Sequence, residues 1–123
     1  MIMAGFEKAN SYLYIKFDPE IKEVMDSLMK DISLVRSGKM FGYPAYYINR
    51  KMFACIYEDG VGVKLPGDKA QQLLESENIT HFQPMGRKPM REWIYIRHAD
   101  PSGFKNDIDI FDASIKYIAS LNK

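Results

Sequence analysis

Apolar residues recur at helical spacing early in the chain. Asp18 is a good N-cap residue, and Pro19 suits the first helical position, where an N–H group has no intrahelical acceptor. An apolar stripe follows at intervals of three and four residues: Ile21, Val24, Met25, Leu28 and Ile32. The pattern predicts an amphipathic helix from Asp18 to near Asp31. Residues 1–17 fit both helical and strand spacing, so their state stays open.

From Lys39 to Leu65 the pattern changes to strand alternation. Residues 52–57 alternate between two faces that are both apolar, which predicts a central strand covered on both sides. Gly62 would leave room for a bulky side chain to lie over the sheet. Turn-forming residues occur at Gly42–Pro44, Asn49–Arg50 and Asp59–Gly60, and we expect three short strands within the stretch.

The second half of the chain repeats both patterns. Pro66–Asp68 should begin a short helix, and residues 92–97 alternate as a strand. Residues 78–83 lead into a further extended segment, and residues 106–121 form the last helix. We therefore expect one α+β domain over residues 1–123. It should be a two-layer α/β sandwich with a mostly antiparallel sheet, in the order helix, three strands, helix, one or two strands, helix.

The last helix is apolar over more than half of its circumference. One stripe, which contains Phe111 and Ile115, is expected to face the core. Three further residues widen that face, which indicates that more than one surface of the helix is covered. We predict a contact with a protein partner, or with a second copy of the chain, at Ile110, Tyr117 and Leu121.

Composition excludes several classes of protein. With 123 residues, 46% of them hydrophobic, the chain is long enough to bury a core without disulfides or a metal. The single Cys fits a reducing compartment, so we expect a cytoplasmic protein, and no apolar run is long enough to span a membrane. The net charge of +1 conceals an asymmetry: residues 36–97 hold ten Lys/Arg and six Asp/Glu, whereas the two ends are net acidic.

Several short motifs, in order and at consistent spacing, resemble the TfoX N-terminal domain of the TfoX/Sxy competence regulators. The resemblance covers roughly residues 36–121 and is closest to the small stand-alone members of the family. It implies a two-layer α/β fold with an antiparallel sheet, and it brings no catalytic residue and no cofactor to this chain. The residues that carry it are Lys39–Gly42, Asn49–Ala54, Val63–Leu65, Phe82 and Gly86–Met90.

Residues 84–91 are the best candidate binding loop. Arg87, Lys88 and Arg91 lie close together, and Gly86 would let a ligand approach the backbone. An arginine fork suits phosphate or carboxylate, so the loop is a candidate site for an anion or a partner, including a small anionic substrate. The structural interpretation is that Pro84 and Pro89 fix the loop and the cations are simply solvated.

Other chemistry finds less support in the sequence. Cys55 alternates with apolar neighbours, as a small hydrophobe does, although His81 or His98 would serve as a base if it were a nucleophile. No spacing of ligands indicates a metal site. Aromatic residues near cations would suit nucleic-acid binding, but strand aromatics more often form cross-strand pairs. We expect a non-enzymatic binding or regulatory module that uses no cofactor.

Overall fold

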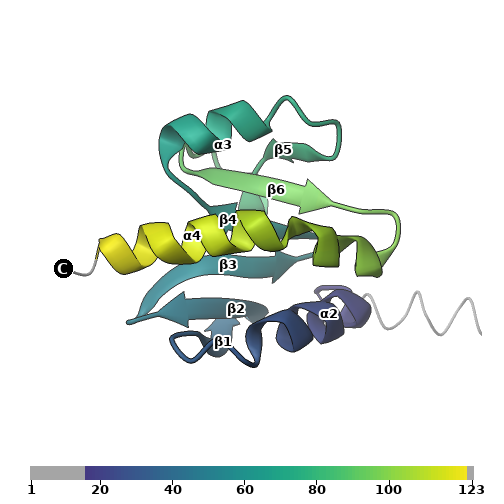
Figure 1. Ribbon diagram of the computed structural model, residues 1–123. Helices are drawn as coiled ribbons and strands as arrows, with labels where there is room; N and C mark the ends of the chain where they lie inside the picture. The colour runs from purple at the N-terminus through teal and green to yellow at the C-terminus, as the bar shows by residue number, and fades with distance from the viewer. Residues whose placement is uncertain (1–15, 122–123) are drawn as a thin grey trace, which may run out of the picture.

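An antiparallel sheet forms the centre of the structure, a computed structural model that describes residues 16–121 (Figure 1). The sheet has the strand order β1-β2-β3-β4-β6-β5, and every neighbouring pair is antiparallel. The open question about residues 1–17 falls mostly outside the described residues; Phe17 makes an isolated bridge with Glu58. The six strands are β1 (Arg36–Met40), β2 (Tyr43–Ile48), β3 (Lys51–Tyr57), β4 (Gly60–Lys64), β5 (Ile79–His81) and β6 (Trp93–Arg97).

Three α-helices pack on one face of this sheet: α2 (Pro19–Met29), α3 (Gly67–Leu73) and α4 (Ile108–Ser120) (Figure 1). The first begins as predicted, because the Asp18 carboxylate accepts a hydrogen bond from the backbone N–H of Glu20 at 2.9 Å. A 3₁₀ helix, Pro101–Asp107, leads directly into α4. The predicted α+β class, two layers and antiparallel sheet are confirmed. Among residues 16–121, no helix is both long and apolar enough to cross a membrane.

The segment from Arg36 to Lys64 contains four strands, so the prediction of three strands here was wrong. The missed strand is β1, whose sequence RSGKM is exposed at four of its five positions. An edge strand that buries no side-chain face has no apolar alternation to reveal it. Pro44 also misled the prediction, since it lies inside β2 opposite Lys39 and the turn is formed by Phe41 and Gly42.

Two polar side chains tie the helices to the sheet. The Ser114 hydroxyl of α4 is fully buried, and it lies 2.5 Å from the carbonyl oxygen of Lys64 and 3.3 Å from that of Phe53. The Tyr46 hydroxyl of β2 donates to Asp26 of α2 at 2.6 Å, and burial, with this bond, raises the pKa of Tyr46. Because neither buried hydroxyl is left unpaired, the core gains position-specific contacts without an orphaned polar group.

The opposite face of the sheet carries a second cluster, here called the aromatic face, to which no residue of α2, α3 or α4 contributes. Gly62 of β4 lies under the Phe82 ring, and Gly60 lies under the Tyr95 ring. The two rings stack with centroids 5.6 Å apart. Because the two glycines have no side chain, the flat rings can cover β4 on the face where no helix packs. The cluster comprises Ala45, Cys55 and Phe82, with Met40, Tyr47, Met52, Tyr57, Met90, Trp93 and Tyr95 packed around them.

Gly62→Ala should destabilise the fold by about 1–3 kcal/mol, because a methyl group there overpacks the face. An ideal Cβ at Gly62 would lie 2.6 Å from the Phe82 ring, well inside van der Waals contact. Gly38→Ala is the matched control: its Cβ would lie 3.1 Å from Tyr47, at the exposed edge. Urea denaturation measures both. Equal losses at the two positions would contradict this account of Gly62.

Candidate functional site

The three cations of the predicted loop do not act together. Arg91 pairs with Asp68 at 2.7 Å and lies across Gly67, so it joins the start of β6 to α3. Arg87 and Lys88 are exposed and form no ion pair with any residue that the structure describes. The surroundings of Arg91 therefore match a surface ion pair. Arg87 and Lys88 remain open to an anionic partner.

The predicted contact residues of α4 differ in exposure. Ile110 and Tyr117 are partly buried and pack against the core, whereas Leu121 is 44% exposed. Burial, followed by a hydrogen bond to Glu92, raises the pKa of Tyr117. Two of the three side chains are thus largely used within the fold, and Leu121 is the one most available to a partner.

The structure does not join Cys55 to a histidine in a reactive pair. Cys55 is fully buried on the aromatic face, and burial raises the pKa of its thiol to about 12. His98 instead faces Asp107 at 2.7 Å, and its ring stands edge-on to Phe104. His81 lines a hollow at the surface. No group of three or more His, Cys, Asp or Glu residues within 16–121 is arranged to hold a metal ion.

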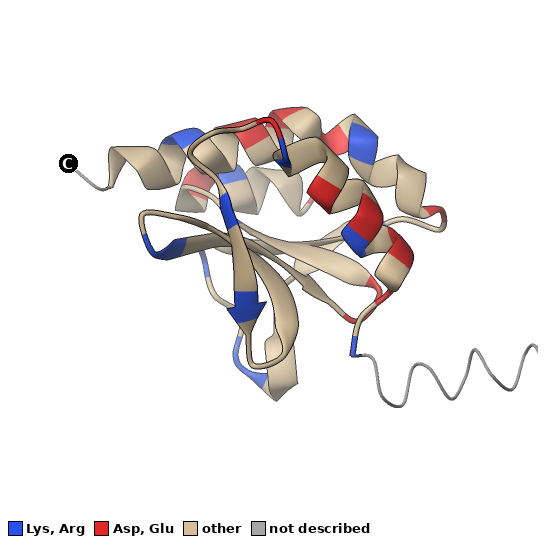
Figure 2. Cartoon of the chain, turned by 90° about the horizontal axis from the view of Figure 1, so that it is seen from below, with Lys and Arg blue, Asp and Glu red and all other residues tan. Residues whose placement is uncertain are grey.

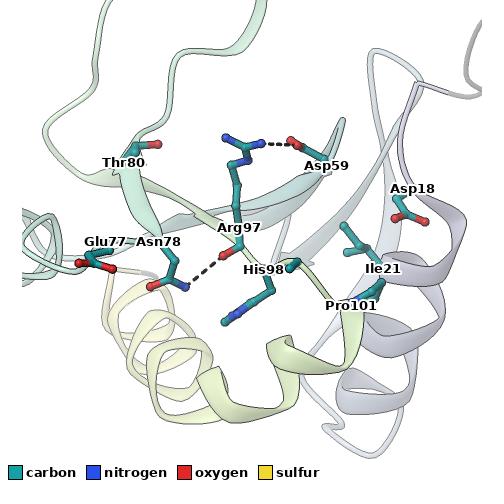
Figure 3. Close-up of a pocket in the computed structure, with 10 residues that line it drawn as sticks. Asp18, Ile21, Asp59, Glu77, Asn78, Thr80, Arg97, His98 and Pro101 are labelled. Atoms are coloured by element: carbon teal, nitrogen blue, oxygen red, sulfur yellow. Dashed lines mark hydrogen bonds and ion pairs between the residues drawn. The ribbon is translucent and has the colours of Figure 1, made fainter.

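A hollow of about 520 Å³ opens beside the end of β6 (Figure 3). Arg97 reaches across it to pair with Asp59 at 2.7 Å, and Asn78 donates to the Arg97 carbonyl oxygen at 3.1 Å. The hydroxyl of Tyr95 lies 2.9 Å from the same Asp59 carboxylate. A second hollow, of about 340 Å³, shares Asp59 and Arg97. Sequence reasoning missed this cluster of interacting side chains because its members are far apart in the chain.

One ion pair, between Arg97 and Asp59, joins charged groups within these hollows. The side chains of Arg97 and Asp59 are 60% and 59% exposed, so water screens their pairing. His98 directs its Nε2 atom to Asp107, which is not among the residues lining the hollow. The arrangement holds the β3–β4 turn against β6, and its chemistry is that of a structural ion pair.

The aromatic face borders the second hollow, which Tyr57, Phe82 and Tyr95 help to line. Tyr57 lies at its centre, with ring centroids 4.7 Å from Tyr43, 5.8 Å from Phe82 and 6.4 Å from Tyr95. Trp93 packs 5.6 Å from Phe82. Most of these rings are partly exposed, so the cluster is both a small core and a surface. Protein interfaces are enriched in such aromatic and Met side chains.

Two turns beside this face hold apolar residues in left-handed backbone. Phe41 has a φ of 51° and is 67% exposed, and Met85 has a φ of 55° and is 51% exposed. Each is followed by a glycine of positive φ. A bulky residue is uncommon in this conformation, which favours Gly and Asn. At the corresponding position of the β2–β3 turn the chain has Asn49, with a φ of 49°. Sequence reasoning missed both sites because the pattern of apolar residues along the chain gives no information about the backbone angle φ.

Charge separates between the two layers. Figure 2 shows Asp and Glu mainly on the helices and the β3–β4 turn, whereas Lys and Arg occur on the helices and also on the hairpins and loops below them in that view. Near the aromatic face, the Lys16 ammonium lies 5.6 Å from the centre of the Tyr43 ring. Glu58 is the acidic exception, and its charge contributes, after burial and Tyr57, to raising the pKa of Tyr43. The uneven distribution of charge along the sequence is therefore also present in the folded structure.

The family model of the TfoX N-terminal domain matches residues 27–102, which is more than half of the chain. The chain belongs to the TfoX N-terminal domain family. The match begins within α2 and ends before α4, whereas the sequence resemblance was expected over 36–121. No curated protein and no solved structure gives a significant match. The match establishes the family and does not assign a specific role to this TfoX N-terminal domain.

Cys55 of this TfoX N-terminal domain should resist thiol reagents at pH 8 while the domain is folded. The thiolate is the reactive form, and both burial and a pKa of about 12 oppose it. Ellman's reagent should therefore titrate one thiol only after unfolding in urea. Rapid labelling of the native domain would show that the aromatic face opens to solvent.

Phe41→Asn should leave the domain folded and raise its stability by about 1 kcal/mol, because Asn tolerates the left-handed conformation better than Phe. Thermal unfolding measures the change. Asn49→Phe is the matched opposite substitution, and it should lower stability because it places a bulky residue at the corresponding position, where φ is 49°. A loss of stability in Phe41→Asn would show that the Phe41 side chain supports the fold.

Proposed function

We propose that this TfoX N-terminal domain is a non-enzymatic binding module with a regulatory role, and that it contacts a protein partner through the aromatic face. The observation that carries the proposal is the pair of exposed apolar side chains, Phe41 and Met85, held in left-handed backbone at the margin of that face. Strained residues of this kind cluster at binding and switch sites. Exposed Leu121, which follows α4 on the other side of the sheet, is a separate candidate contact.

The composition of the face supports a protein partner. Met40, Met52 and Met90 lie among its rings, and flexible Met side chains suit surfaces that must adapt to another protein. Arg97 forms an ion pair with Asp59, which also accepts a hydrogen bond from Tyr95, so this cluster gives less support to binding of a small anionic substrate. The single cysteine fits a cytoplasmic location for the module.

Photo-crosslinking tests the proposal. Benzoylphenylalanine placed at position 41 should form adducts with a partner in the native host, because this side chain lies at the contact. The same group at Leu34, which is 56% exposed and outside the aromatic face, is the matched control. Adding Met85→Asn should reduce the adducts formed at position 41. Equal yields at positions 41 and 34, or none at 41, would contradict the proposal.

A further inference from the structure

The two exposed side chains border one pair of rings. The backbone N–H of Met85 donates to the Tyr57 hydroxyl at 2.9 Å. The Tyr57 ring lies 4.7 Å from that of Tyr43, which directly follows the Phe41–Gly42 turn. Phe41 and Met85 are therefore attached to opposite members of the Tyr43–Tyr57 pair. A partner segment that crosses this pair would meet both side chains.

Cations surround the same place. Lys16 lies over the Tyr43 ring, and Arg87 and Lys88 follow Gly86 directly. None of the three forms an ion pair with a residue in the described part of the chain. Arg97, in contrast, is occupied by Asp59. The charges near the two side chains are therefore available to a partner of negative charge, with Glu58 as their one acidic neighbour in the Tyr43 surroundings.

We infer that the partner presents an acidic peptide segment whose apolar side chains pack between Phe41 and Met85 over the Tyr43–Tyr57 pair, while its carboxylates face Lys16, Arg87 and Lys88. This inference rests on the proposed function and adds the chemistry of the partner. Apolar anchors that are desolvated on binding supply most of the affinity of such contacts. The cations select against neutral and basic segments.

Other occupants fit the surface less well. A second copy using the same face would bring its own cations against these three, and like charges in contact oppose association. A single-stranded nucleic acid needs flat rings on which bases stack. Phe41 is the one ring here that exceeds half exposure among the described residues, and Met85 offers no ring. The observations therefore favour an acidic peptide.

Selection from a displayed library of random peptides tests the inference, with the full chain immobilised as bait. Enriched peptides should combine Asp or Glu with Leu, Phe or Trp. Synthetic fluorescent copies should lose affinity by at least about tenfold for the double variant Phe41→Asn/Met85→Asn, as expected for anchor residues. Arg87→Glu/Lys88→Glu should weaken binding most at low salt. Leu34→Asn, an exposed apolar position outside the face, should leave affinity unchanged.

The alternative outcomes separate the two proposals. Enrichment of neutral or basic peptides that still require Phe41 and Met85 would overturn the acidic partner and retain the binding face. Peptides that bind the double variant as tightly as the parent chain, or a library that yields none, would overturn the inference. In either case crosslinking at position 41 still decides the proposed function by itself. Binding of a fluorescent oligo(dT) that depends on the same residues would replace the peptide by nucleic acid.

Discussion

The structure depends on how the sheet covers the face that has no helix. An exposed apolar sheet face is costly in water, and this one is closed by rings lying flat across β4. Gly60 and Gly62 make that possible, since any side chain at either position would occupy the space of the Tyr95 or Phe82 ring. Phe82 is carried by the segment after β5, so this packing also positions the connection to residues 84–91. The core and the candidate surface are therefore parts of one arrangement.

Elements that bury one side were predictable from the sequence. The stripe from Ile21 to Ile32, the alternation in β3 and β6 and the role of Gly62 all follow from periodicity, because burial selects apolar residues at regular intervals. β1 was not predictable on this basis, since it is an edge strand whose residues face solvent. Its pairing comes from the backbone and from the Phe41–Gly42 turn, which leave no apolar pattern in the sequence.

The candidate site was predictable only in part. Arg87, Lys88 and Arg91 were predicted together as a candidate site for an anion or a partner; the first two are exposed, but Arg91 has a partner 23 positions away in Asp68. Long-range pairs of this kind, like Arg97 with Asp59, arise from strand register, which a single sequence does not specify. Phe41 and Met85 escaped prediction for another reason: their unusual feature is a backbone angle, and Phe and Met ordinarily signal burial.

The exposed edge at β1 bears on the solubility of the domain. An unpaired strand offers a row of N–H and C=O groups that can template the addition of other chains. Arg36 and Lys39 place charge along this edge, and Gly38 lowers its strand propensity, so its sequence discourages growth into a larger sheet. Neutralising these cations would remove that protection and favour edge-to-edge aggregation. The same residues that concealed β1 from sequence reasoning thus serve to keep the molecules apart.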